Sequence, residues 1–252
     1  MVQFITAIRQ VYRDSCKDED IAWNTYFARP LAAILVYLLR PTPITPNQVT
    51  LLGAAVFFGA AAAFVAVPGP MGCLVAAAVV QLSYLFDCAD GQLARLKSMT
   101  SEVGAHLDFL IDEIKALLLV GALCVRMWWW EEQELWLVAG IAAIFLVAMA
   151  TSMTTFVRRP EYAGTEIKPG ESARKRSMPA SLVGKVIWIV EAVARYFVHY
   201  PSWILWVALV GFFAPLDSAI LFLVPFLGVY LLYLTRTCLA VIWKLGRPSF
   251  YS

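Results

Sequence analysis

The chain has 252 residues, of which 61% are hydrophobic and 15% charged, with a mean hydropathy of +0.71. Soluble domains contain about 45–50% apolar and about 25% charged residues, so this composition excludes an ordinary soluble protein and indicates an integral membrane protein. The net charge of +2 is too small to indicate a nucleic-acid partner, and two histidines are too few for a histidine-rich zinc site.

Long apolar runs predict an all-α polytopic membrane protein with six transmembrane helices. Residues 41–86 contain no charged side chain and are interrupted only by a Pro-Gly-Pro turn at 68–70. Because about 20 residues cross a bilayer, this run predicts two spans. We expect the fifth span to be interrupted in its first half, where Glu191, Arg195 and Pro201 lie. The six predicted spans are 48–67, 71–90, 105–127, 135–157, 186–213 and 217–243.

The chain before the first span carries a shorter apolar segment. Residues 23–40 have apolar positions on one helical face but are bounded by prolines, so we expect an N-terminal amphipathic helix in the membrane interface. We predict one domain over 1–252, with an N-terminal region 1–47, a six-helix bundle 48–243 and a tail 244–252. Six spans put both ends and most basic residues, including the cluster 174–176, on one side, which the positive-inside rule makes cytoplasmic.

Four carboxylates lie at the facing ends of the second and third predicted spans. Asp87 and Asp90 are three residues apart, and Asp108 and Asp112 are four apart, so each pair shares a helical face. A charge at membrane depth costs about 2.5–3.5 kcal/mol, and clustered anions also repel one another, which favours a bound cation. Ligation by oxygen alone indicates Mg²⁺ or Mn²⁺.

Small residues and one arginine flank these acids. Gly91 and Gly104 lack a Cβ, Ala94 keeps the same wall small, and the permanently charged Arg95 suits a diphosphate. The combination indicates metal-assisted chemistry on a pyrophosphate-type substrate. The alternative is a set of interfacial salt bridges with Arg95 and two neighbouring lysines, 97 and 115, which would leave the interleaved glycines unexplained.

The spacing of these residues resembles the class I signature of the CDP-alcohol phosphotransferases at every specified position. The signature reads D-x2-D-G-x2-A-R-x8-G-x3-D-x3-D over residues 87–112, and residues 45–50 (TPNQVT) are similar to a second element of that family. The resemblance implies a membrane homodimer that uses two divalent cations, Mg²⁺ or Mn²⁺. In that family an acceptor hydroxyl attacks the phosphorus of the CDP-linked donor that bears the alcohol, and CMP leaves.

The resemblance also implies roles for individual residues. The metal ligands would be Asp87, Asp90, Asp108 and Asp112, with Asp112 also acting as the catalytic base. Gly91, Ala94, Arg95 and Gly104 would line the CDP pocket. We add Asn47 to that pocket; its alternative role is to cap the first span.

Three further arginines are candidates for binding a phosphate of the acceptor or the donor. Arg158 and Arg159 end the fourth predicted span, and Arg195 lies inside the fifth. The alternatives are headgroup contact for the first two and snorkelling for Arg195.

We expect transfer of a phosphatidyl group from CDP-diacylglycerol to an acceptor alcohol in phospholipid biosynthesis. Membrane lipids are expected partners, and nucleic acid is not. A CDP-linked small alcohol, of the inositol or amino-alcohol type, is the alternative donor, with a lipid or polyol phosphate as acceptor.

A cation transporter is a distant alternative, because no polar residues continue the acidic cluster across the bilayer. A prenyltransferase has acidic motifs in two distant parts of the chain, whereas these lie within 26 residues. Likeness to bacterial and archaeal members predicts a prokaryotic plasma membrane, with the active site facing the cytoplasm.

Overall fold

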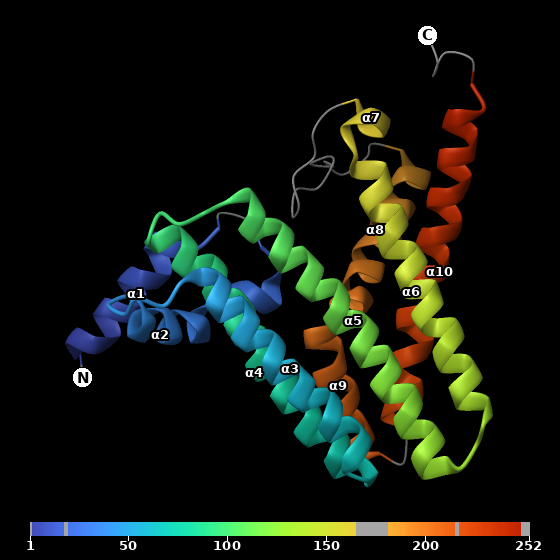
Figure 1. The fold of residues 1–252 in the computed structure, drawn as a ribbon, viewed down its shortest axis with the longest axis horizontal. Helices are drawn as coiled ribbons and strands as arrows, with labels where there is room; N and C mark the ends of the chain where they lie inside the picture. The colour runs from blue at the N-terminus through green and yellow to red at the C-terminus, as the bar shows by residue number, and fades with distance from the viewer. Residues whose placement is uncertain (1, 18–19, 165–180, 215–216, 248–252) are drawn as a thin grey trace. The chain divides into compact units, whose positions relative to one another are not determined.

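The computed structural model describes residues 2–17, 20–164, 181–214 and 217–247 (Figure 1). Every regular element in these ranges is a helix, which confirms the predicted all-α class. Helices long and apolar enough to cross a membrane are α3 (Pro46–Ala66), α4 (Gly69–Leu96), α6 (Leu135–Arg158) and α10 (Ser218–Leu245). The other elements are α1 (Val2–Ser15), a π-helical turn η1 (Asn24–Ala28), α2 (Arg29–Leu39), α5 (Glu102–Glu131), α7 (Pro160–Ala163), α8 (Leu182–Val198) and α9 (Tyr200–Phe213).

The predicted spans match the structure in four cases, and two need comment. Residues 105–127 lie within α5, which is not among the four apolar helices because charged side chains recur along it. The fifth predicted span is broken into α8 and α9, which meet at 74° with Pro201 in the first turn of α9. Counted as one span, this pair makes five. The six-span count therefore stays a prediction, and the basic cluster 174–176 lies outside the described residues.

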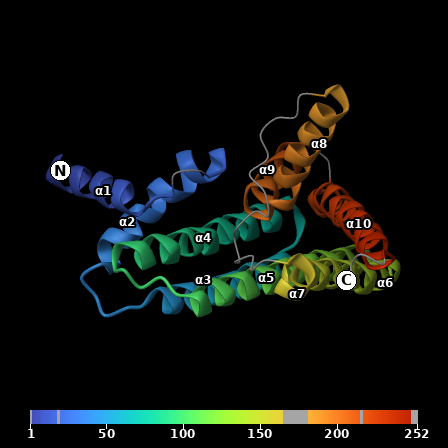
Figure 2. The same ribbon diagram turned by 90° about the horizontal axis from the view of Figure 1, so that it is seen from above.

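Two compact units make up the chain, residues 1–115 and 116–252. In the first, α3 and α4 run side by side (Figures 1 and 2) and are joined by a turn at Gly69, whose φ of +68° suits a residue without a side chain. The two helices approach closely at Gly53, where an added Cβ would lie 3.0 Å from the Cβ of Phe86. Ser83 Oγ donates a hydrogen bond to the Gly53 carbonyl at 2.7 Å.

The start of α3 is fixed by its own sequence. Thr45 is the N-cap: its hydroxyl accepts from the Gln48 amide at 3.4 Å, and the Gln48 side chain accepts from the Thr45 amide at 2.9 Å. Pro46 occupies the first turn, where a missing N–H costs nothing. The alternative role for Asn47, capping this helix, is therefore wrong.

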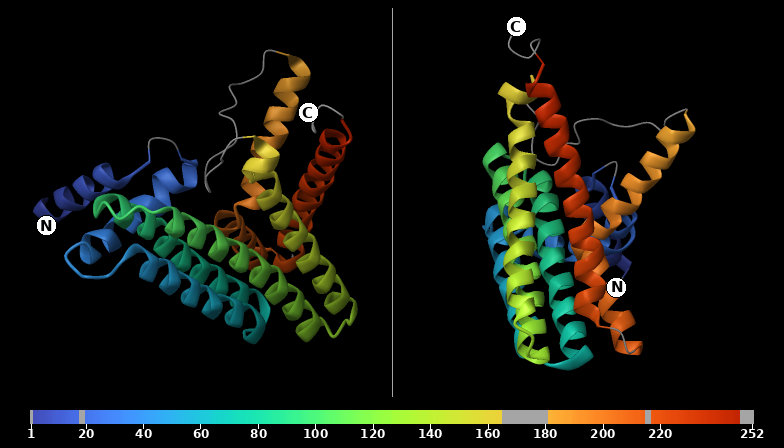
Figure 3. Two further views of the ribbon diagram at one scale, coloured as in Figure 1. Left: turned by 45° about the horizontal axis from the view of Figure 1, so that its top comes forward. Right: turned by 90° about the vertical axis from the view of Figure 1, so that its right-hand side faces the viewer.

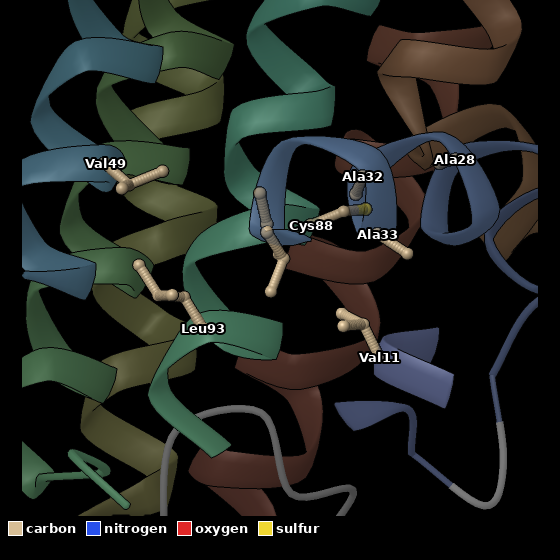
Figure 4. Close-up of a cluster of buried hydrophobic side chains, with 9 residues drawn as sticks. Val11, Ala28, Ala32, Ala33, Val49, Cys88 and Leu93 are labelled. Atoms are coloured by element: carbon tan, nitrogen blue, oxygen red, sulfur yellow. The ribbon is translucent and has the colours of Figure 1, made fainter. Parts of the chain in front are cut away.

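The N-terminal helices pack on the end of α4 that carries the aspartates. Val11 of α1, the small side chains Ala32 and Ala33 of α2, and Leu93 of α4 belong to one buried cluster (Figure 4). The sequence predicted a helix over 23–40, which the structure shows as η1 and α2, whereas α1 was not predicted. The interfacial position of this segment remains a prediction.

An ion pair and two hydrogen bonds connect the chain around η1 to α4. Asp20 forms an ion pair with Arg29 and accepts from Asn24 Nδ2 at 2.9 Å, and Tyr84 of α4 donates to Asn24 Oδ1 at 2.6 Å. Burial raises the pKa of Asp20, but the hydrogen bond from Asn24 and the positive charge of Arg29 outweigh it, so the pKa lies below its ordinary value. The ionised form of Asp20 therefore stabilises the fold.

Asp20→Asn should lower the free energy of unfolding at pH 7 by about 1–3 kcal/mol, because Arg29 loses its charged partner. A carboxylate with a lowered pKa contributes stability above its ordinary pKa of about 4 and loses it as the pH falls. The difference between wild type and variant should thus shrink as the pH drops below about 4, as measured by unfolding at several pH values. Asp14→Asn, on the exposed face of α1, serves as the control. A difference that does not change with pH would contradict the assigned ion pair.

In the second unit, α6 and α10 pack together (Figure 3), and Thr154 and Tyr233 share a hydrogen bond of 2.8 Å between their hydroxyls. Arg236 of α10 binds Glu191 of α8 at 2.9 Å. An added Cβ on Gly140 of α6 would lie 2.9 Å from the Cβ of Cys124, so α5 and α6 also approach closely.

Candidate active site

Three aspartates from two helices converge at one point in the first unit. One carboxylate oxygen each from Asp87 of α4 and from Asp108 and Asp112 of α5 can be chosen so that all three lie within 4.8 Å of one another. The two α5 aspartates are one helical turn apart, so both reach the side that meets α4. The structure thus brings together three of the four predicted acids.

A buried lysine lies among these acids. Lys115, whose side chain is 3% exposed, donates from Nζ to Asp87 Oδ1 at 2.6 Å, and the same nitrogen lies 3.6 Å from Asp112 Oδ1. The salt-bridge alternative is therefore realised for Lys115 alone. Arg95 donates instead to the Ser15 carbonyl, and Lys97 donates to the Thr42 and Ile44 carbonyls at 2.8 Å each. The single positive charge of Lys115 leaves most of the negative charge of the three aspartates unbalanced.

The residues at this point fit a divalent cation. Among the described residues no group hydrogen-bonds Asp108 Oδ1, although this atom is buried. A buried carboxylate oxygen without a partner carries a desolvation cost, which a cation would offset. The side chain of Asp112 is 47% exposed, so the cluster is open to a substrate on that side. Oxygen ligands of this kind suit Mg²⁺ or Mn²⁺.

Asp90 has a different environment from the other three acids and is not part of their group in the described structure. It is 6% exposed, and its Oδ2 accepts a hydrogen bond of 2.5 Å from the Thr50 hydroxyl. Thr50 lies in the TPNQVT segment, but no role was predicted for it from the sequence. This contact joins that segment to the signature.

Thr50→Val keeps the shape of the side chain and removes the hydroxyl that holds Asp90. We expect the variant to lose about 1.5–3 kcal/mol of stability, the usual range for a hydrogen bond to a charged group. Thermal unfolding measures the loss, with Thr151→Val of α6 as the control, because the Thr151 hydroxyl bonds to carbonyls of its own helix at 3.0 and 3.2 Å. Equal stability losses in both variants would show that the Asp90 contact contributes nothing particular.

Four of the five predicted CDP-pocket residues form two close pairs, Gly104 with Asn47 and Gly91 with Arg95. An added Cβ on Gly104 would lie 3.2 Å from Asn47 Oδ1 and 3.0 Å from Ser101 Oγ, so the first turns of α3 and α5 lie close together. An added Cβ on Gly91 would lie 3.5 Å from Arg95 Nη1, an ordinary contact distance. Ala94 is half-buried on the same helix.

The sequence did not predict which groups hold the Arg95 side chain in place. Its Nε donates to the carbonyl of Ser15 at the end of α1, and Gln92 donates from Nε2 to the Arg29 carbonyl at 3.3 Å. In the described part of the chain the buried Nη2 of Arg95 has no hydrogen-bond partner, which leaves that nitrogen as a donor for a ligand.

Comparison with known proteins agrees with this geometry. The family model for CDP-alcohol phosphatidyltransferases matches residues 43–214, which include the four aspartates and most of the helices. The chain belongs to the CDP-alcohol phosphatidyltransferase family. It is therefore a membrane transferase of substituted phosphate groups, as the signature predicted.

A relative in Corynebacterium glutamicum is a phosphatidylinositol phosphate synthase. The two sequences are 32% identical over 157 residues, which cover 62% of this chain and 67% of the relative. The relative supports membership of the same family and a role in phospholipid synthesis.

The three candidate arginines belong to the second unit of the chain, whereas the aspartates belong to the first. Arg158 ends α6 and is half-buried, Arg159 follows it and is exposed, and Arg195 is exposed on α8. Their role in binding a phosphate stays a prediction.

Proposed function

We propose that this protein transfers a phosphatidyl group from CDP-diacylglycerol to an acceptor alcohol and releases CMP. The observation that carries the proposal is the convergence of Asp87, Asp108 and Asp112, three acids of the family signature, within 4.8 Å. The name of the relative in Corynebacterium glutamicum, a phosphatidylinositol phosphate synthase, supports a phosphatidyl product and an inositol phosphate as the acceptor.

In this proposal the four signature aspartates hold two divalent cations, Mg²⁺ or Mn²⁺. The unpartnered oxygen of Asp108 and the oxygen-only ligand set support that assignment. Bound cations of this kind neutralise a diphosphate and stabilise the departing nucleotide phosphate. Thr50 holds Asp90 in place from α3.

Asp112 acts as the base that takes the proton of the acceptor hydroxyl. Its half-exposed side chain is more accessible to an entering alcohol than that of Asp87, which is 15% exposed. Because an alcohol has a much higher pKa than a carboxylic acid, the proton moves late, and the position of the hydroxyl dominates the rate. Asn47, Gly91, Ala94, Arg95 and Gly104 bind CDP in this scheme.

The acceptor phosphate, in the same scheme, is bound by Arg158, Arg159 and Arg195. An arginine exposed on a largely apolar helix, such as Arg195, needs a polar partner, which supports its assignment.

The proposed placement in the membrane has six spans, with α5 as the third and the broken pair α8 and α9 as the fifth. The N-terminal segment 23–40 lies in the interface, and the chain is one domain that forms a homodimer in a prokaryotic plasma membrane. The active site faces the cytoplasm, which the excess of basic residues near it supports.

The test is to incubate purified protein and Mg²⁺ with one donor and one acceptor at a time. CDP-diacylglycerol is compared with CDP-inositol, CDP-choline and CDP-ethanolamine, and the acceptors are inositol phosphate, glycerol phosphate, inositol, serine and diacylglycerol. We expect CMP release with CDP-diacylglycerol and a phosphorylated polyol, and a product of matching mass. Release only from a CDP-linked small alcohol would overturn the phosphatidyl assignment.

A further inference from the structure

Lys115 occupies a position that neither the family signature nor the proposed reaction uses. It lies on α5 three residues after Asp112, and its side chain is almost completely buried. Its ammonium is 2.6 Å from an oxygen of Asp87 on α4 and 3.6 Å from an oxygen of Asp112. Lys115 thus joins the two helices that supply the acids.

Without a metal, this lysine supplies the positive charge that the acids need. The neighbouring basic residues Arg95 and Lys97 are committed to backbone carbonyls. Removing one partner of a buried ion pair leaves the other charge uncompensated, which destabilises a fold strongly. Lys115 therefore holds α4 and α5 together at this point.

The same contact opposes metal binding. While Lys115 donates to Asp87 Oδ1, the lone pair that accepts this hydrogen bond is not open to a cation, and two positive charges at one carboxylate repel each other. A lysine here lowers the affinity for a divalent ion relative to a site without one.

We propose that Lys115 is a built-in counter-cation that keeps the aspartate cluster assembled before metal binds and sets how tightly the metal is held. The inference rests on the proposed metal-dependent function. Two divalent ions would balance four carboxylates, so Lys115 would also leave the loaded site with an excess positive charge, which suits an anionic diphosphate.

The experiment measures Mn²⁺ binding and thermal unfolding of the full chain without any donor. Lys115→Met should unfold at a lower temperature than wild type when metal is absent, and saturating Mn²⁺ should remove most of that difference. Its dissociation constant for Mn²⁺, from the signal of free Mn²⁺ in electron paramagnetic resonance, should fall roughly tenfold. Lys115→Arg should keep the wild-type behaviour.

Lys185→Met is the matched control, because Lys185 is exposed on α8. It should change neither measurement. Mn²⁺ binding by Lys115→Met that equals wild type, or is weaker, overturns the proposal, because a lysine that only fills space would not compete with a cation.

A second variant covers the case in which Lys115→Met does not fold. Asp87→Asn combined with Lys115→Met removes the charge together with its partner and should recover folding in the absence of metal. If the double variant is as unstable as Lys115→Met, the alkyl chain of Lys115 stabilises the fold and its charge does not, and the proposal fails. Neither measurement needs turnover, so loss of the proposed reaction and loss of this inference are distinguished by CMP release from the wild type.

Discussion

Asp112→Asn is expected to reduce CMP release by about 10²–10⁴-fold, the usual contribution of a positioned general base. Asparagine has nearly the same size as aspartate but cannot accept the proton of the acceptor hydroxyl. CDP-diacylglycerol should still bind with an affinity within a few-fold of wild type, because Asp87 and Asp108 keep their carboxylates. The measurements are steady-state CMP release and equilibrium binding of the donor in the presence of Mg²⁺.

Two comparisons make this prediction specific. Asp14→Asn makes the same chemical change on the exposed surface of α1, where Asp14 accepts from Gln10, and should leave the rate unchanged. Asp90→Asn should instead weaken metal-dependent binding of the donor, because Asp90 is a proposed metal ligand. This residue is buried and accepts a hydrogen bond from Thr50. Near-normal CMP release from Asp112→Asn would remove this residue from the role of base.

Removal of divalent cations should abolish turnover, and Mg²⁺ or Mn²⁺ added back should restore it. The reason is electrostatic: three converging carboxylates repel a diphosphate unless cations lie between them. Dialysis against EDTA followed by CMP-release assays measures the loss, and EDTA saturated with Mg²⁺ beforehand is the control for effects of the chelator itself. Turnover that persists after complete chelation would contradict a metal-dependent reaction.

Circular dichroism should show that the chelated protein keeps its helices. The ion pair between Lys115 and Asp87 joins α4 to α5 without metal, so loss of activity should not reflect loss of fold. This outcome separates a catalytic requirement for metal from a structural one.

The apolar runs predicted α3, α4, α6 and α10 because each is long and free of interrupting charge. The spacing of Asp108 and Asp112 likewise predicted that both would lie on one face, and the structure brings them to Asp87. The sequence also predicted a span over 105–127, which lies within α5. This helix is not among the four apolar ones, because charged residues such as Lys115 and Arg126 continue beyond the signature acids.

Contacts between distant segments could not be predicted in the same way. The hydrogen bonds between Thr50 and Asp90 and between Arg95 and Ser15 join residues 40 and 80 positions apart. Their partners depend on how helices pack, which a single sequence does not specify. Helix α1 was missed because its polar residues keep it from standing out as an apolar segment, although Phe4, Ile8 and Val11 recur at helical spacing.

The carbonyl that holds Arg95 comes from outside the region shared with the family. Ser15 precedes residue 43, where the match to the family begins, yet it restrains an arginine of the signature itself. If Arg95 binds CDP as proposed, members that differ only in this leading segment would carry identical motifs and still bind the nucleotide with different affinity. Comparison of the motifs alone would then not predict the affinity for the donor.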